Sequence, residues 1–262
     1  MKKKLKRPIR FRVANILRRL SFGHRPYTTA VILAGGSGSR MGDMGGTPKQ
    51  WMKIGDMSVL ERSVAAFEMC PQIDEIVVVV RRGEGQAAAA ALRACETKKV
   101  RAVVAGGATR QHSAYNGARH ASAETQFLAI HDAARCLITP EDISATVNAA
   151  YAAGAACLGR PATDTVKRVN NAGYVTETCD RSELWYAATP QVMMYPMYIS
   201  AATEALRIGK TVTDDTMLIE ALGQRVAMVE AKGEILKITH PQDIAMAEGL
   251  LAKREENADD AV

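Results

Sequence analysis

A glycine-rich stretch followed by two cations carries the clearest chemical signal in the chain. An apolar run that ends at Leu33 is typical of a buried strand, and a loop of small residues follows it. Glycine leaves room for main-chain N–H groups to close around an anion, and Arg40 and Lys49 add positive charge suited to phosphate. We therefore predict a nucleotide-binding loop that contains these small residues: Ala34, Gly35, Gly36 and Gly38.

This loop differs from the two commonest nucleotide loops. A Walker loop ends in Gly-Lys followed by Ser or Thr, and the chain has no such element here. The dinucleotide fingerprint needs a third glycine at the position that Met41 occupies. A glycine cluster after a strand also serves as a plain tight turn, so the surrounding elements must decide between the two interpretations.

Two further segments place polar side chains where predicted strands end. Gly106 and Gly107 lead into a helix that carries Arg110 and Ser113, an arrangement that suits a base and its hydrogen bonds. Asp132 follows a predicted strand, where a carboxylate can meet Mg²⁺ and ribose hydroxyls. The alternatives are an ordinary helix entry for the first segment and a helix cap for the second.

Alternating strands and helices must position these residues. We expect strands at 30–33, 74–80, 100–105, 127–130 and 155–158, with helices at 58–69, 86–95, 109–120 and 140–153 between them. This order predicts an α/β fold with a doubly wound, mostly parallel, Rossmann-like sheet. Ligands of such sheets bind beyond the carboxyl ends of the strands, which is where the candidate residues lie.

The later part of the chain departs from this alternation. Two short strands at 165–169 and 174–178 around a polar turn predict a protruding hairpin arm at about 161–182. A lone hairpin is not self-sufficient, so we expect it to pack against another subunit and form a homodimer; an ordinary surface hairpin is the alternative. We expect helices at 197–206, after 213–215 and at 242–251, and strands at 226–230 and 235–238.

Positive charge is concentrated in one segment of the 262 residues. The net charge is +6, yet residues 1–27 hold ten Lys or Arg and no Asp or Glu, so the remainder is net negative. This excludes nucleic-acid binding by the main domain. The segment predicts a basic amphipathic helix that touches a membrane surface or a partner; a solvated tail and an organelle-targeting peptide are the alternatives. We divide the chain into this extension (1–28), a main α/β domain (29–252) that holds the candidate nucleotide loop, and a C-terminal tail (253–262).

Cysteine usage and hydropathy indicate a cytoplasmic protein. The five cysteines are an odd number without a C-x-x-C pair, which is typical of reduced thiols rather than disulfides or a zinc site. No run of 18 apolar residues is present, so no membrane span is expected.

Several motifs in order resemble one enzyme family. The form G-x-G-x-R-M followed by P-K-Q resembles the phosphate loop of sugar-phosphate nucleotidyltransferases, above all the 2-C-methyl-D-erythritol 4-phosphate cytidylyltransferase family. Six stretches between residues 29 and 251 are similar to that family: G-G-x-x-R-x-x-S at 106–113, H-D-A-A-R at 131–135, D-T-x-K at 164–167, D-R-x-x-L-W at 180–185, T-P-Q at 189–191 and K-I-T at 237–239. Cys136 stands where the family pattern has proline, and Ile235 where it has asparagine.

The resemblance implies roles for individual residues. Lys237 would join Arg40 and Lys49 in balancing phosphate charge during catalysis. Asp132 would bind the nucleotide and Mg²⁺. Four residues would bind the acceptor, two of them from the arm of a neighbouring subunit: Arg135, Thr165, Arg181 and Thr189. His131 is expected to be structural.

The implied reaction transfers CMP from CTP to 2-C-methyl-D-erythritol 4-phosphate. It gives the CDP-linked alcohol and pyrophosphate in non-mevalonate isoprenoid precursor synthesis. A ribitol 5-phosphate cytidylyltransferase of wall-polymer synthesis is the first alternative, because A-K-G-E at 231–234 resembles those enzymes. A non-catalytic nucleotide-binding protein tethered by its basic tail is the second.

Overall fold

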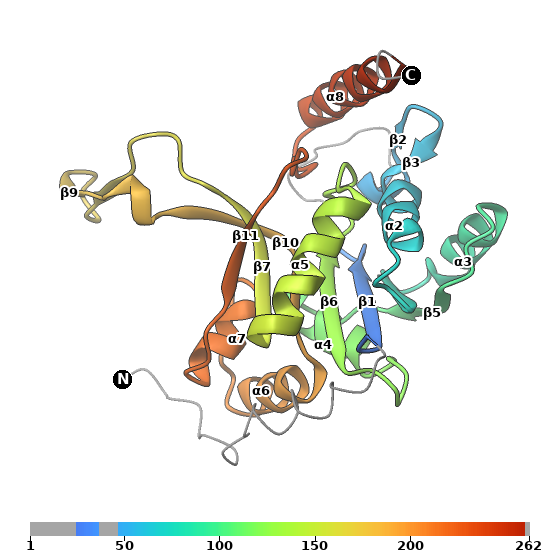
Figure 1. Ribbon diagram of the computed structural model, residues 1–262, viewed down its shortest axis with the longest axis horizontal. Helices are drawn as coiled ribbons and strands as arrows, with labels where there is room; N and C mark the ends of the chain where they lie inside the picture. Colours follow the sequence, from blue (N-terminus) through green and yellow to red (C-terminus); the bar gives the residue numbers. More distant parts are fainter. Residues whose placement is uncertain (1–24, 37–46, 260–262) are drawn as a thin grey trace.

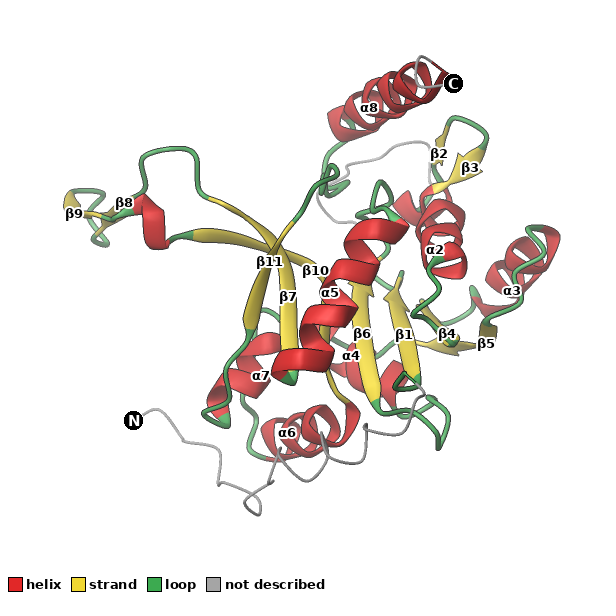
Figure 2. Ribbon diagram, viewed as in Figure 1, coloured by secondary structure: helices red, strands yellow, loops and turns green. Residues whose placement is uncertain are grey.

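A single large sheet organises the chain. The computed structural model describes residues 25–36 and 47–259. Among them, seven strands form a sheet in the order β11-β7-β10-β6-β1-β4-β5 (Figures 1 and 2). The strands are β1 (Thr28–Leu33), β4 (Glu75–Val80), β5 (Val100–Ala105), β6 (Phe127–Asp132), β7 (Ala155–Pro161), β10 (Trp185–Met194) and β11 (Ala227–Glu230). Every pairing except those of β10 is parallel, which confirms the expected mostly parallel sheet.

Helices cover both faces of this sheet. On one face lie α2 (Val59–Met69) and α5 (Pro140–Ala153), which touch each other. On the other lie α4 (Arg110–Ala118), α6 (Tyr195–Arg207) and α7 (Thr216–Ala221). The remaining helices are α3 (Gly85–Ala94), beside the edge strand β5, and α8 (Gln242–Asp259), which stands at the top of Figure 1. Strands with helices on both faces read as continuous apolar runs, and all six residues of β4 are buried.

Local sequence signals set the helix ends. Ser58 and Glu61 form the predicted capping box at the start of α2, each side chain bonding the other's backbone N–H. Thr139 caps α5 and Pro140 opens it, while Gly154 ends it with φ +88°, a conformation that favours glycine. These signals explain why the predicted bounds of both helices agree with the structure.

Two small elements extend from the main sheet. The arm is formed by β8 (Lys167–Val169) and β9 (Val175–Thr178), which pair antiparallel and project away from the body (Figure 1). A second hairpin, β2 (Lys53–Ile54) and β3 (Met57–Ser58), was not predicted. It contributes Ile54 to a second core, separate from the main one, into which α8 inserts Ala247.

The structure corrects several predicted bounds. Residues 235–238 do not form a strand, whereas β10, which was not predicted, is central. The expected C-terminal tail is helical, since α8 continues to Asp259 through strong helix formers such as Ala, Lys, Arg and Glu. The fold also begins before residue 29, because the Arg25 guanidinium pairs with both carboxylate oxygens of Asp74 at 2.7 Å.

Candidate nucleotide-transfer site

A pocket of about 630 Å³ opens at the carboxyl ends of four parallel strands. The loops after β1, β4, β5 and β6 all contribute to its lining, as expected for a ligand site of a doubly wound sheet. Eight of the predicted site residues line it: Ala34, Gly35, Gly36, Lys49, Arg110, Ser113, Asp132 and Lys237. Segments as far apart in sequence as 34–36 and 237–239 therefore meet at one place.

Asp132 lies between two cations. Its Oδ1 accepts a hydrogen bond from Arg110 Nε at 2.9 Å, and its Oδ2 accepts one from Lys237 Nζ at 2.7 Å. Burial opposes ionisation, but the two positive charges hold the pKa of the Asp132 carboxyl well below its usual range. The carboxylate is therefore charged at every physiological pH.

Arg110 also binds a second carboxylate, that of Asp215. Arg110 Nη1 donates to Asp215 Oδ2 at 2.7 Å, and Asp215 is fully buried. Burial raises the pKa of the Asp215 carboxyl, which the Arg110 guanidinium counteracts. The backbone N–H of Asp215 donates to the side-chain oxygen of Gln191 at 2.8 Å, which fixes the start of α7. Burial opposes the charge of Arg110, but the two carboxylates outweigh it and raise the pKa of Arg110, so the guanidinium stays positive.

The segment that carries Lys237 is irregular and is held by side chains. Both carboxylate oxygens of Asp142 accept backbone N–H groups, from Lys232 and from Gly233, each at 2.9 Å. Arg135 Nη1 donates to the Ile235 carbonyl at 2.6 Å. These bonds replace the strand pairing that the apolar pattern predicted, which is why an unpaired segment keeps a defined path.

The turn after β5 brings backbone close to the pocket. Ser113 Oγ accepts from the Gly107 N–H at 3.1 Å and donates to the Thr109 carbonyl at 2.9 Å. A Cβ atom at Gly106 would lie 2.9 Å from the same hydroxyl, and one at Gly107 only 2.4 Å from the His112 Cβ. Glycine is therefore required at Gly107, and a side chain at Gly106 would displace the Ser113 hydroxyl; Gly106 itself lies beside the lining rather than in it.

Lys49 lines the pocket and contacts the segment that carries Lys237. It begins the short 3₁₀ helix η2 (Lys49–Trp51), and its Nζ donates to the Ile238 carbonyl at 3.3 Å. This bond spans the space between the phosphate-loop side and the Lys237 segment. The predicted residues Gly38 and Arg40 lie outside the described residues.

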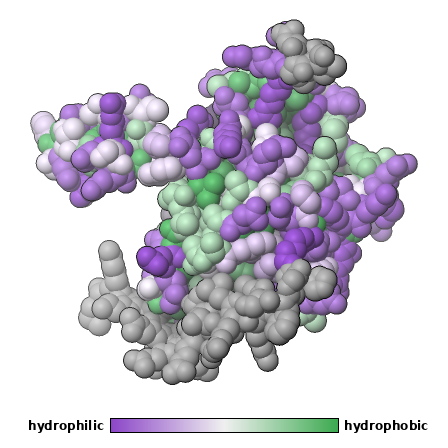
Figure 3. Space-filling model, viewed as in Figure 1, coloured by the Kyte–Doolittle hydropathy of each residue, from purple (hydrophilic) through white to green (hydrophobic). Residues whose placement is uncertain are grey.

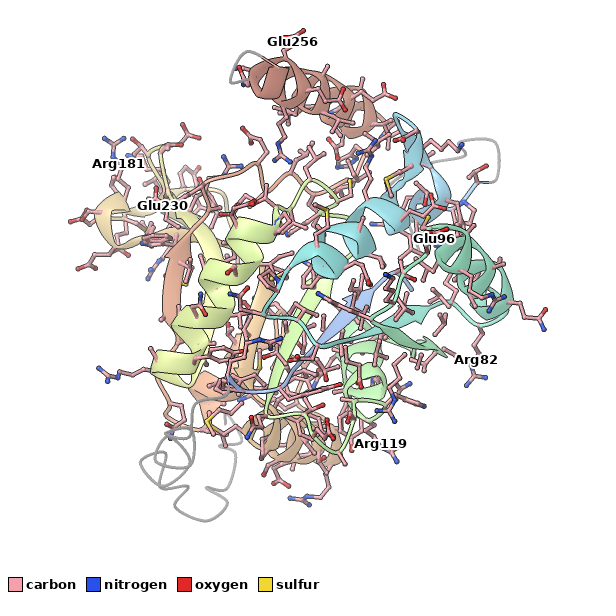
Figure 4. All side chains as sticks on the ribbon, turned by 45° about the vertical axis from the view of Figure 1, so that its right-hand side comes forward. Arg82, Glu96, Arg119, Arg181, Glu230 and Glu256 are labelled. Atoms are coloured by element: carbon pink, nitrogen blue, oxygen red, sulfur yellow. The ribbon has the colours of Figure 1, made fainter. Side chains whose placement is uncertain are left out.

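The four predicted acceptor residues are not gathered around this pocket in the single chain. The Arg135 guanidinium is directed to the backbone at Ile235, and burial lowers its pKa. The hydroxyl of Thr189 is buried, where it accepts the Asp132 N–H at 3.1 Å. Thr165 and Arg181 are exposed on the arm, and Figure 4 shows the Arg181 side chain pointing outward.

His131 has a structural environment, as expected. It is fully buried, its ring lies 4.9 Å from the Phe67 ring, and its Nδ1 is 3.0 Å from the Thr189 hydroxyl. Burial lowers the pKa of His131 to about 3, so the ring is neutral at physiological pH.

The donor set determines what kind of metal site can exist here. No group of three or more His, Cys, Asp or Glu placed to hold a metal ion occurs in the described part of the chain. Asp132 is the one acidic residue among the described residues of the lining. Mg²⁺ usually takes one or two carboxylates together with substrate phosphates and water, and a carboxylate has about four lone-pair sites. The pocket therefore fits a magnesium ion that arrives with a triphosphate.

Sequence reasoning missed three residues of this site. Asp215 was part of the stretch 213–215, which was expected only to precede a helix, and its link to Arg110 joins residues far apart in the chain. Arg81 and Gln50 also line the pocket; Arg81 belonged to no motif, and Gln50 ended the P-K-Q motif without an assigned role. Arg81 comes directly after a predicted strand, and Gln50 comes directly after Lys49. These positions were the signal that could have identified them.

Comparison with known proteins gives a consistent result. A family model described as IspD, 2-C-methyl-D-erythritol 4-phosphate cytidylyltransferase, matches residues 28–253. A protein with that enzyme name from Desulforamulus reducens is 42% identical over 226 residues, covering 86% of this chain and 96% of the relative. Another from Pelotomaculum thermopropionicum is 37% identical over 227 residues, covering 86% and 94%.

Solved structures agree with the sequence relatives. The crystal structure of 4-diphosphocytidyl-2C-methyl-D-erythritol synthase from Anaerococcus prevotii matches with a TM-score of 0.77 at 27% identity, covering 87% of this chain and 96% of that one. A second crystal structure of a 4-diphosphocytidyl-2C-methyl-D-erythritol synthase matches with a TM-score of 0.70 at 31% identity, covering 87% of this chain and 99% of that one.

Proposed function

The chain belongs to the 2-C-methyl-D-erythritol 4-phosphate cytidylyltransferase family, and we propose that it transfers the cytidylyl group of CTP to 2-C-methyl-D-erythritol 4-phosphate. A phosphate oxygen of the acceptor forms a bond to the α-phosphorus of CTP, and the bond from that phosphorus to the bridging oxygen of pyrophosphate breaks. The product is the CDP-linked alcohol of non-mevalonate isoprenoid precursor synthesis. The observation that carries this proposal is the Arg110–Asp132–Lys237 cluster inside a glycine-lined pocket.

Three cations serve the phosphates in this proposal. Lys49 and Lys237 both line the pocket, and Arg40 belongs to the same phosphate loop by sequence. Phosphoryl-type transfer needs alignment of the reacting groups and stabilisation of charge more than it needs a covalent catalyst. Mg²⁺ bound beside Asp132 would neutralise charge on the phosphate oxygens. Asp132 in turn holds Lys237 in place by the 2.7 Å bond.

The nucleotide is assigned to the glycine-lined walls. Backbone at Ala34, Gly35 and Gly36 would meet the ribose and phosphates. The Gly106–Gly107 turn with Ser113 would meet the base, since tight backbone approach and a polar side chain can discriminate its edge.

We assign acceptor binding to a site completed by a second subunit. The arm carries exposed apolar side chains, Val169, Tyr174 and Val175, each more than half exposed, which a partner would cover. Figure 3 shows the arm standing clear of the body with apolar atoms among polar ones. In a homodimer the arm would bring Thr165 and Arg181 to the partner's pocket, where Arg135 and Thr189 support the far wall. Arg181 suits a phosphate dianion because its planar guanidinium donates two parallel hydrogen bonds.

The extension at residues 1–27 is proposed to contact an acidic membrane surface from the cytoplasm. Its ten cations and absence of acidic residues support this proposal. Among the described residues, no helix combines the length and the apolar character needed to cross a bilayer.

Pyrophosphate release by the full chain tests the proposed reaction. The protein would be incubated with CTP and Mg²⁺, in parallel with methylerythritol phosphate, with ribitol 5-phosphate and without acceptor. We expect release with the first acceptor alone, and its loss when a chelator removes Mg²⁺. Release with ribitol 5-phosphate alone would keep the chemistry and overturn the acceptor. Binding of CTP without release in any reaction would favour the non-catalytic alternative.

A further inference from the structure

The turn between β4 and α3 holds two side chains that the proposed reaction does not use. Arg81 follows the last residue of β4, and Glu84 precedes α3. The N–H of Glu84 donates to the Arg81 carbonyl at 3.1 Å, and Gly83 adopts φ +87° at the third position of the turn. Only glycine takes this conformation readily, so the turn is tight and the two side chains have a fixed spacing.

Arg81 binds the beginning of the phosphate loop. Its Nε and Nη2 both donate to the Gly36 carbonyl, at 3.0 and 2.5 Å. Two charge-assisted bonds to one acceptor fix the direction of that carbonyl more firmly than one neutral bond. Arg81 also lines the pocket, so its remaining N–H groups stay next to the nucleotide space.

Glu84 binds the end of the same loop. Its Oε2 accepts from Gln50 Nε2 at 2.7 Å, and Gln50 is only 2% exposed. Gln50 is the neighbour of Lys49 in η2, so fixing Gln50 also fixes the backbone that presents Lys49. One four-residue turn thus binds both Gly36 and Gln50, which are separated by thirteen residues of the chain.

We infer that Arg81 and Glu84 are positioning residues that fix the two ends of the phosphate loop and so present Gly36 and Lys49 to the nucleotide. This inference rests on the proposed function, in which Lys49 meets the phosphates of CTP. Holding a loop in its bound geometry removes part of the ordering cost from nucleotide binding. It also maintains the alignment that the transfer step needs, since small misplacements at a reacting centre lower rates steeply.

Equilibrium binding of CTP and Mg²⁺ to the full chain, without acceptor, tests this inference separately from turnover. The variants are Arg81→Met and Glu84→Ala, with Arg82→Met as the matched control. Arg82 is exposed in the same turn and extends outward in Figure 4. We expect Arg81→Met and Glu84→Ala each to weaken CTP binding about tenfold, and Arg82→Met to change it less than twofold. The KM for the acceptor should stay near the wild-type value.

Conservative variants separate positioning from folding. Glu84→Gln keeps an oxygen that accepts from Gln50, so it should restore most of the CTP affinity that Glu84→Ala loses. Wild-type CTP affinity in both Arg81→Met and Glu84→Ala would overturn the inference, as would equal losses in Glu84→Gln and Glu84→Ala. A wild-type protein that binds CTP but releases no pyrophosphate would overturn the proposed function instead.

Discussion

The ionised carboxylate of Asp132 links the charged side chains of the site. Lys237 and Arg110 each donate to one carboxylate oxygen, and Asp215 holds Arg110 in turn. Lys237 keeps 39% of its side chain exposed, so it is available to a ligand, whereas Asp215 is fully buried. Within one network, exposure therefore distinguishes the proposed catalytic side chain of Lys237 from the buried carboxylate of Asp215.

Replacing Lys237 should affect turnover far more than folding. We expect Lys237→Met to lower kcat about 100-fold, the usual loss when one preorganised charge is removed from a transition state. The melting temperature should change little, because Arg110 still pairs with Asp132. Lys253→Met, at an exposed position of α8, is the matched control. Steady-state kinetics and thermal unfolding measure both effects, and equal turnover in the two variants would contradict the role of Lys237.

His131 should make stability depend on pH. Its folded pKa of about 3 lies below the unfolded value of 6.5, so the unfolded chain binds a proton more readily. The stabilisation of the folded state by the neutral His131 ring is complete above pH 6.5 and decreases as the pH falls toward 3. Between pH 7 and pH 5 we expect a loss of about 2 kcal/mol from this residue. Urea unfolding of wild type and His131→Asn checks it; an equal loss in both proteins would contradict the assignment.

At the scale of elements, close packing of helix α4 against the sheet positions Arg110 and Ser113. A Cβ at Gly117 would lie 2.4 Å from Val31 Cγ1 and 2.7 Å from Val79 Cγ2, so the helix rests directly on β1 and β4. The same contact places the start of α4 over the carboxyl ends of these strands. The nucleotide site thus depends on a glycine at the far end of the helix.

Gly117→Ala should therefore destabilise the protein by about 1–3 kcal/mol, the usual cost of overpacking a core. Gly85→Ala is the matched control, because a Cβ there would meet no atom within 4 Å. Removing the flexibility of Gly85 from the unfolded chain should leave stability unchanged or raise it slightly. Chemical denaturation of the two variants measures the difference, and equal stabilities would contradict the packing argument.

The sequence was most informative where local signals determine structure. The capping box of α2 and the continuous apolar run of β4 agree with the prediction because both depend on neighbouring residues. β10 was missed because Pro190 interrupts its apolar run, and proline normally argues against a central strand. Residues 235–238 were assigned to a strand because their apolar residues resemble one, whereas bonds from Asp142 and Arg135 hold them.

The site residues also divide into those that local sequence signals predict and those that only the folded chain brings together. The glycine loops and Asp132 could be found because each follows a strand that the sequence predicts. The partnership of Arg110 with Asp215, and that of Arg81 with Gly36, join segments that only the folded chain brings together. No spacing rule along the chain could supply them without the resemblance to a family.

At the scale of the whole molecule, the proposed dimer builds each complete site from residues of two chains. The Arg181 Nη1 donates to the Thr163 carbonyl at 2.8 Å on the same arm, well away from the pocket of its own chain. If the arm reaches the pocket of a partner subunit, each complete site combines Lys49 of one chain with Arg181 of the other.

Mixing two inactive variants tests this arrangement. Lys49→Ala and Arg181→Ala should each be nearly inactive alone. After subunit exchange, half of the dimers would be mixed and each would contain one intact site, so activity should return to about a quarter of the wild-type value. No recovery in a mixture shown to exchange subunits would contradict a site shared between chains. A Lys49→Ala, Arg181→Ala double variant mixed with either single variant is the control and should stay inactive.

The most direct test of the central claim is the identity of the nucleotide product. The full chain would be given CTP, UTP, ATP and GTP together with Mg²⁺ and methylerythritol phosphate, and the products would be identified by mass spectrometry. We expect a single sugar-nucleotide product, the CDP-linked alcohol, formed together with an equal amount of pyrophosphate. A product that carries another base, or the absence of any nucleotide-linked alcohol, would contradict cytidylyl transfer as the function of this pocket.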